Sequence, residues 1–309
     1  MAERGVLLPP SGLLFLRHHL SSRELDAQCW QQELRTEDFV VCRTKFRGGR
    51  FDEVPNLPAG NRRSWSKIRV VLGGRIFATT RSGGVVMEPG DIVVSRGWDD
   101  HRCRSLGDES EYLLVAWKHG NAGERPTDGG PIHLRGVDAV RGPSARALDL
   151  ATAINGRSPA AIEHAAKVLV RSMVDFGLPL EPEVTQESSE RILHADRRFS
   201  RAIEATLFEL ASRPMAIDLG RVLGITERHA LRLANDFLRR YYVTAIGWRE
   251  AVRGLRLELG VFFATNPRAT TERVSRAVGF SSPTALCHAF HAAGLPSPNA
   301  VRRRLLQEA

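Results

Sequence analysis

The chain has 309 residues, which suggests two domains, and its 42% hydrophobic and 26% charged residues allow buried cores and exclude a disordered or fibrous protein. Its four cysteines are scattered without a CxxC pair, which argues against a disulfide framework or zinc cluster and favours a reducing cytoplasm. The net charge of +9 is uneven: residues 1–189 carry 25 Lys and Arg against 24 Asp and Glu, whereas residues 190–309 carry 19 Arg, no Lys and 11 Asp and Glu.

The N-terminal run from Leu7 to Leu16 is apolar but is interrupted by Pro9, Pro10 and Gly12. It lacks the charged leader of a signal peptide and is too short to span a bilayer. We therefore expect it to belong to the folded domain, and we expect no membrane partner.

Residues 36–118 are predicted to form β structure. Short segments rich in β-branched and aromatic residues alternate there with Gly, Pro and Asp clusters; they read FVVCRTKF, KIRVVLGGRIFATT, GVVMEPGDIVVS and EYLLVAWKH. This spacing is typical of a small antiparallel barrel or sandwich.

A barrel with a hollow centre could hold a small molecule. The candidate ligand-binding residues are Trp65, Arg69, Trp98, His101, Tyr112 and Trp117. The alternative is that the aromatic side chains fill the core. A buried Arg69 would need a partner, which an anionic or carbonyl-bearing ligand could provide, and so could Asp91 or Glu88.

Residues 144–176 change to a helical pattern, with Ser158–Pro159 as the start of a second helix and Gly177 as its stop. The apolar positions at helical spacing could form a homodimer interface or pack on the barrel; they are Leu148, Ala151, Ile154, Ile162, Ala165, Leu169 and Met173. Residues 178–190 are rich in Pro and Glu, as in a linker. The predicted organisation is residues 1–143 as an N-terminal domain, 144–178 as a helical connector, 179–190 as a linker and 191–309 as a C-terminal domain.

A first helix-turn-helix pattern reads AIDLGRVLGITERHALRLANDF, from Ala216 to Phe237. Gly224 suits the turn and Thr226 can cap the following helix. The expected packed seam consists of Leu219, Val222, Leu223, Ile225, Ala230, Leu233 and Phe237. Arg228, Leu231 and Arg232 are expected to point outward, and arginine forks suit the edge of guanine in the major groove. Two solvated arginines on a helix are the alternative.

A second helix-turn-helix pattern reads TERVSRAVGFSSPTALCHAF, from Thr271 to Phe290. Gly279 supplies the turn, Ser281 or Ser282 caps, and Pro283 lies in the first turn. Thr284, Cys287 and His288 are expected to face outward. Because this face lacks an Arg, its base readout should be weaker. Nearby, Arg302, Arg303 and Arg304 could meet phosphate or form an ordinary solvated helix end.

Residues 197–305 resemble the DNA-binding domain of AraC/XylS-family transcription regulators. The matching elements are LGITERHALRL, RLELGVFF, VSRAVGFSSPTALCHAF and GLPSPNAVRR. The resemblance implies two subdomains joined by a long helix near residues 244–264, with both recognition helices in successive major-groove turns. It implies base contacts by Arg228, Leu231, Arg232, Thr284, Cys287 and His288, to which the basic run adds Arg302 and Arg303 as candidate DNA-binding residues. It also implies RNA polymerase as a partner and a role as activator.

Residues 36–118 look like the cupin-type sensory domain often fused to such a unit. The supporting residues are VVLGGRIFATT and MEPGDIVVSRGWDDH, where Pro89–Gly90–Asp91 is followed by His101. A metal-binding cupin needs several histidines and a carboxylate around one ion, and NRRSWSK contains no His-x-His. We therefore expect no metal and no other cofactor.

The predicted fold class is α+β multidomain: an N-terminal cupin-like β-barrel, a helical connector and a C-terminal all-α domain with two helix-turn-helix subdomains. The predicted function is that of a cytoplasmic, non-enzymatic transcription regulator that binds double-stranded DNA as a homodimer and responds to a small-molecule effector. Two alternatives stay open. One is a cupin-type metalloenzyme with an appended helical domain. The other is an interaction module that does not bind DNA, which Ala234 and the stretch LRRYYVTAIGW would suit, since they depart from the family pattern.

Overall fold

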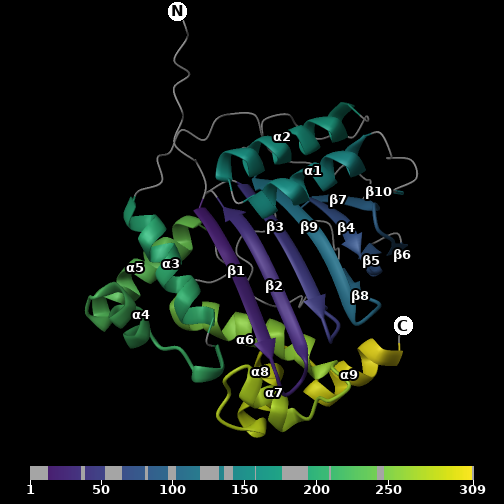
Figure 1. Cartoon of the computed structure of the whole chain (residues 1–309). Coiled ribbons are helices and arrows are strands. Elements are labelled where there is room, and N and C mark those ends of the chain that lie inside the picture. The colour runs from purple at the N-terminus through teal and green to yellow at the C-terminus, as the bar shows by residue number, and fades with distance from the viewer. Residues whose placement is uncertain are drawn as a thin grey trace, which may run out of the picture.

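The structure is a computed structural model that describes residues 13–35, 39–52, 65–80, 83–96, 102–118, 132–135, 142–156, 158–175, 194–208, 210–241 and 247–307. Figure 1 shows an N-terminal domain of strands with two helices across it, and C-terminal helices that extend around one side and the lower end of the strands. This arrangement confirms the predicted α+β class.

Two antiparallel sheets form the N-terminal domain, which we call the β domain. The larger sheet has the strand order β1-β2-β3-β9-β4-β7-β10. Its strands are β1 (Leu13–Ser22), β2 (Ala27–Arg35), β3 (Phe39–Arg47), β4 (Trp65–Gly73), β7 (Ile92–Arg96), β9 (Glu109–Lys118) and β10 (Ile132–Leu134). The smaller sheet has the order β6-β5-β8, with β5 (Ile76–Thr80), β6 (Gly83–Met87) and β8 (Arg102–Ser105).

Apolar side chains from the two sheets share one buried core. The larger sheet contributes Val71 and Val93, and the smaller sheet contributes Ile76, Ala78, Met87 and Cys103. The strands extend beyond residues 36–118, where β structure was predicted, because β1 and β2 precede residue 36 and β10 follows residue 118, although all lie within the predicted domain of residues 1–143. The polar sequences of β2 (AQCWQQELR) and of the end of β1 (RHHLSS) gave no clear alternation to indicate strands.

Helices α1 (Pro143–Gly156) and α2 (Pro159–Asp175) cover the other face of the larger sheet (Figure 1). Their buried residues include Leu150, Ile154, Ile162, Leu169 and Met173, which pack against residues such as Ile68 and Leu113. Of the apolar positions proposed for a dimer interface, only Leu148 is exposed, at 61%. The others therefore pack within the β domain, the second of the two predicted possibilities.

The C-terminal helices are α3 (His194–Phe208), the 3₁₀ turn η4 (Leu210–Ser212), α4 (Ala216–Leu223), α5 (Glu227–Tyr241), α6 (Trp248–Ala264), α7 (Thr271–Ala277), α8 (Pro283–Ala292) and α9 (Pro298–Gln307). We call residues 194–241 the first head and residues 271–307 the second head; α6 connects them. None of the described helices is long and apolar enough to cross a membrane.

Candidate nucleic-acid interface

The first head contains the predicted helix-turn-helix, formed by α4 and α5. The carboxylate of Asp218 accepts a hydrogen bond of 2.8 Å from the backbone N–H of Met215 and so caps α4. Gly224 ends α4 in the left-handed conformation, with φ of 70°. Thr226 Oγ1 then accepts the backbone N–H of His229 at 3.4 Å and caps α5. The predicted roles of Gly224 and Thr226 are therefore confirmed.

The seam between α4 and α5 is mostly as predicted. Leu219, Leu223, Ala230 and Phe237 are buried, and Ile225 and Leu233 are partly buried against the same core. The rings of Phe199 in α3 and Phe237 in α5 lie 5.2 Å apart, which anchors α5 to the rest of the first head. The prediction for Val222 was wrong: it is 54% exposed, because its side of α4 is left uncovered.

The outward face of α5 carries two free cations. Arg228 and Arg232 are exposed, lie one helical turn apart, and make no ion pair or hydrogen bond with any residue that the structure describes. Leu231 was predicted to share this face, but it is half-buried and packs against the core. The face available to a ligand is therefore narrower and more basic than predicted.

The second head repeats the motif with α7 and α8. Thr270 Oγ1 accepts the backbone N–H of Arg273 at 3.2 Å and caps α7, and Gly279 turns the chain with φ of 78°. Of the two candidate serines, Ser282 is the cap of α8, because its Oγ accepts the backbone N–H of Ala285 at 3.1 Å. Pro283 occupies the first turn, as expected.

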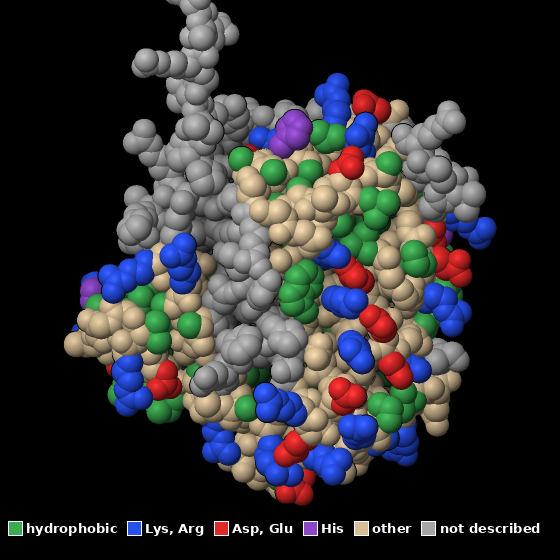
Figure 2. All heavy atoms as spheres, in the orientation of Figure 1, with side chains coloured by type: hydrophobic (Ala, Val, Ile, Leu, Met, Phe, Trp, Pro, Cys, Tyr) green, Lys and Arg blue, Asp and Glu red, His purple; other side chains and the backbone are tan. Residues whose placement is uncertain are grey.

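The outward face of α8 is nearly uncharged. Thr284 and His288 are exposed, as predicted, whereas Cys287 is half-buried. On the face seen in Figure 2, Lys and Arg side chains gather along the outer edge of the first head, whereas over the second head and the strands they are interspersed with Asp and Glu.

The three arginines near the C-terminus differ in what they touch. Arg302 donates to the backbone carbonyls of Ala269 at 2.9 Å and Pro267 at 3.1 Å, so its guanidinium holds the loop between α6 and α7. Arg303 is exposed. Arg304 pairs with the carboxylate of Asp52, which is almost fully buried. Of Arg302 and Arg303, the two residues predicted to contact DNA, Arg303 is the more available to a phosphate group.

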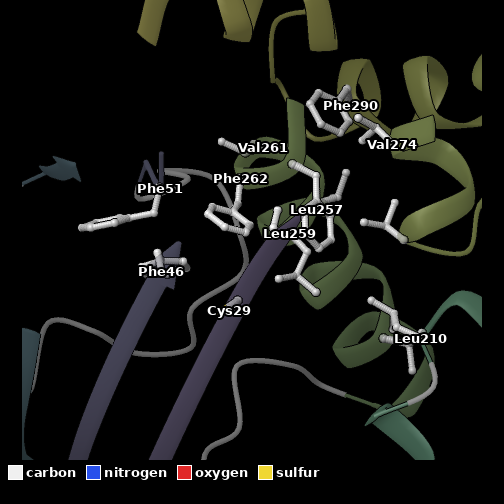
Figure 3. Close-up of a cluster of buried hydrophobic side chains, with 14 of the residues drawn as sticks. Cys29, Phe46, Phe51, Leu210, Leu257, Leu259, Val261, Phe262, Val274 and Phe290 are labelled. Atoms are coloured by element: carbon white, nitrogen blue, oxygen red, sulfur yellow. The ribbon is translucent and has the colours of Figure 1, made fainter. Parts of the chain in front are cut away.

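Helix α6 lies between the two heads and is buried along most of its length. Leu257, Leu259 and Val261 of α6 belong to one buried core with Phe290 of α8 and Val274 of α7, and Figure 3 shows these side chains around α6. Gly260 permits this approach, since a Cβ there would lie 3.0 Å from the Phe290 ring. At the other end, Asn235 Oδ1 accepts the backbone N–H of Trp248 at 3.3 Å and joins α5 to α6. The connecting helix therefore contacts both heads directly.

An interdomain contact, formed by residues 48–52 of the β domain and the end of α6, its following loop and α9, was not predicted. Asn266 Nδ2 donates to the carbonyls of Leu25 at 2.7 Å and Gly48 at 2.5 Å. The backbone N–H of Arg50 donates to Thr265 Oγ1 at 2.6 Å, and Arg50 Nη1 donates to the Leu305 carbonyl at 2.6 Å.

Aromatic rings support these hydrogen bonds. The rings of Phe46 and Phe262 lie 5.1 Å apart, and Phe51 stacks on Phe46 at 4.9 Å (Figure 3). A Cβ at Gly49 would lie 2.6 Å from the Phe262 carbonyl, so only glycine fits there. The second head is thus fixed to the β domain by packing as well as by hydrogen bonds.

The candidate effector residues of the β domain divide into three groups. Arg69 is buried, with its guanidinium carbon 5.1 Å from the centre of the Tyr112 ring, and Tyr112 packs against Phe51 at 5.3 Å. Trp117 fills a core, the alternative given for the aromatic candidates: it is buried on the face of β9 that α1 and α2 cover. Trp98, His101 and the side chain of Trp65 lie outside the described residues.

Metal binding gains no support from the part of the chain that the structure describes, where no three His, Cys, Asp or Glu side chains converge to hold an ion. His133 instead lies 3.3 Å from the carboxylate of Asp91, which also accepts the backbone N–H of Glu88 at 2.9 Å. These two contacts give Asp91 a structural role at the turn before β7.

No family model and no curated protein matches the sequence. Among solved structures, the chain is similar to the AraC-like transcriptional activator CuxR, at 14% identity over 97% of this chain and 87% of that one, with a TM-score of 0.36. It is similar to ToxT from Vibrio cholerae with an unsaturated fatty acid bound, at 11% identity over 86% of this chain and 95% of that one, with a TM-score of 0.33. Similarity to the protein Ylba from E. coli is confined to 36% of this chain, at 10% identity and a TM-score of 0.30, and spans 46% of that protein.

Proposed function

We propose that this chain is a sequence-specific DNA-binding transcription regulator of the AraC/XylS type. The observation that supports it most is the pairing of two capped helix-turn-helix units, each with an exposed recognition helix, on one connecting helix. At 1.5 Å per residue the 17 residues of α6 extend about 26 Å, which suits two recognition helices in neighbouring major-groove turns about 34 Å apart.

Within this proposal the two recognition helices have different roles. Arg228 and Arg232 of α5 read base edges, since they are exposed and free and a guanidinium can donate two hydrogen bonds to one guanine. Thr284, Cys287 and His288 of α8 give a weaker readout. Arg303 meets backbone phosphate, and Arg302 serves first as a support for the loop before α7.

The β domain is proposed to bind a small-molecule effector, and the interdomain contact would carry that signal to the second head. Because residues 48–52 belong to the β domain and touch α6 and α9 directly, a shift of this segment changes how the second head is held. The proposal further includes a homodimer and contact with RNA polymerase, in the cytoplasm where DNA is available. Sedimentation of the purified protein tests the dimer.

The test of DNA binding is fluorescence anisotropy with tiled fragments of the DNA that flanks its gene, at several KCl concentrations. We expect one fragment to bind much more tightly than the others, with an affinity that falls steeply as salt rises, because each neutralised phosphate releases counterions. A protein that is folded by circular dichroism but binds no fragment at low salt would refute the proposal.

A further inference from the structure

The two heads meet at a junction beside the turn of the second helix-turn-helix. The backbone carbonyl of Leu210, in η4, is so close to Gly279 that a Cβ there would lie 2.3 Å from it. Arg213, just after η4, donates from Nη2 to the backbone carbonyl of Phe280 at 3.3 Å. The junction therefore joins the segment before α4 to the segment before α8.

Two guanidinium groups converge at this junction. Arg256 projects from α6 over the Phe280 ring, with its guanidinium carbon 5.8 Å from the ring centre. Its Nε is buried and has no hydrogen-bond partner among the described residues, and neither Arg213 nor Arg256 has an ion pair there. Burial, and then the charge of nearby Arg213, lower the pKa of Arg256. Two like charges thus lie together, and neither pairs with a carboxylate of the residues that the structure describes.

The backbone of Arg213 is unusual as well. Its φ is 60°, in the left-handed region that non-glycine residues seldom adopt. The conformation is held by a hydrogen bond of 3.1 Å from its N–H to the Leu210 carbonyl. Residues in this region cost free energy and are common at functional sites. At this position the conformation directs an arginine to the junction.

The chemistry of the junction suits an oxyanion. Guanidinium groups match the geometry of phosphate oxygens, and a bound phosphate would offset the repulsion between Arg213 and Arg256. Phe280, which both arginines contact, lies two residues before Ser282, the cap of α8. A helix N-terminus favours negative charge. With α8 in a major groove, the flanking strand passes this end of the helix.

We propose that Arg213 and Arg256 together bind one backbone phosphate of DNA, between the two heads. This inference rests on the proposed DNA binding. It identifies two residues, from η4–α4 and from α6, that lie outside both recognition helices. Because a phosphate contact carries no base identity, it contributes equally to every DNA sequence.

The experiment measures anisotropy with a preferred and a random duplex between 50 and about 300 mM KCl. We expect R213Q and R256Q each to reduce the slope of log affinity against log salt by about 0.9, the contribution of one phosphate. In the double variant the slope should also fall by about 0.9, and not by twice that amount, since both side chains hold the same phosphate. The preference for one duplex over the other should stay unchanged. R171Q is the charge-matched control: the Arg171 side chain is exposed on α2, so this variant should keep the original slope.

A second measurement separates DNA phosphate from free phosphate. Thermal unfolding is compared in phosphate and in chloride at equal ionic strength, for the full chain and for R256Q. A changed salt slope supports the proposal. An unchanged slope with specific stabilisation by inorganic phosphate means a free anion is the ligand, and overturns it. Unchanged slopes with no phosphate effect overturn the anion site altogether, and a starting protein that binds no DNA refutes the proposed function too.

The variant R213G distinguishes the loss of a phosphate contact from the loss of folded structure. Glycine adopts positive φ without strain, so R213G should unfold at an unchanged or higher temperature while its salt slope still falls by about 0.9. A purely structural Arg213 would give a lower unfolding temperature and an unchanged slope, which contradicts the proposal.

Discussion

The two heads have the same motif but differ in charge and in attachment. The recognition helix of the first head presents exposed Arg228 and Arg232, whereas that of the second head presents Thr284 and His288 and contains no arginine. The second head is joined to the β domain through hydrogen bonds of the loop before it, such as those of Asn266 to the Leu25 and Gly48 carbonyls. The first head meets the β domain elsewhere, where α3 lies beside β1 (Figure 1).

This difference indicates that one motif has been adapted to two tasks. Under the proposed function, the first head reads bases, and the contacts of the second head relate DNA binding to the state of the β domain. The exposed face of α8 is not used for the interdomain contact, which involves α6, the loop after it and α9. The attachment therefore fixes the orientation of the second head without covering its recognition helix.

The largest expected effect is on base readout by the first head. Replacing both Arg228 and Arg232 by Gln should cost about 2–6 kcal/mol of binding to the preferred duplex, since each guanidinium contact to guanine contributes about 1–3 kcal/mol. T284A in the second head should cost about 1 kcal/mol or less, the scale of one hydroxyl hydrogen bond. Anisotropy titrations with the preferred and a random duplex measure both. Equal losses in the two heads would contradict the division of tasks.

The attachment of the second head is tested by N266A. The substitution removes the donor for the Leu25 and Gly48 carbonyls, and we expect the free energy of unfolding to fall by about 2 kcal/mol, since a buried group left without its partner costs about 1–3 kcal/mol. Urea unfolding followed by circular dichroism measures it. N155A is the control: Asn155 is exposed and bonds to Arg43 across the surface, so the change should be within about 0.5 kcal/mol. If N266A lowers the free energy of unfolding no more than N155A does, the interdomain contact contributes nothing to stability.

The turn glycines give a matched pair for the same comparison. Gly224 has φ of 70°, and a Cβ there would have no atom within 4 Å, so G224A should cost about 1 kcal/mol from backbone strain alone. Gly279 has φ of 78°, and its Cβ would lie 2.3 Å from the Leu210 carbonyl, so G279A should cost about 2 kcal/mol or more. Thermal unfolding of both variants checks the order. The reverse order would mean that the junction between the heads is looser than described.

The elements that the sequence predicted well depend on local rules. Gly224 and Gly279 are required by positive φ, and Thr226 and Ser282 by the free N–H groups at helix starts. These requirements involve residues within four positions of each other, so one sequence suffices to find them. The periodic seam of Leu219, Leu223 and Phe237 follows for the same reason.

The details that the sequence did not determine depend on what packs against each element. Leu231 is half-buried and Val222 exposed because the positions of neighbouring helices, and not periodicity alone, decide which flank of a helix is covered. Trp117 faces α1 and α2 because those helices cover that side of the sheet. Arg50 and Thr265 lie 215 residues apart, and Arg213 and Phe280 lie 67 apart, so no spacing in the sequence could have paired them.

The smallest expected effect is on the rate at which Cys287 of the second head is labelled when DNA is bound. Burial, together with the charges of Glu258 and Cys42, raises the pKa of the Cys29 thiol, and Cys42 and Cys103 are buried as well. Thiolate is the reactive form, so iodoacetamide at pH 8 should label half-buried Cys287 first in the folded protein.

Saturating preferred duplex should then slow labelling of Cys287 several-fold, because Cys287 lies beside Thr284 and His288 on α8 and a helix in the major groove is shielded from solvent. Mass spectrometry of tryptic peptides measures the rate, and labelling of all four cysteines in urea confirms that each is detectable. An unchanged Cys287 rate in the saturated complex would show that only the first head enters a groove. The spacer of about 26 Å would then hold a second head that serves the β domain and not the DNA, which is the strongest form of the difference between the heads.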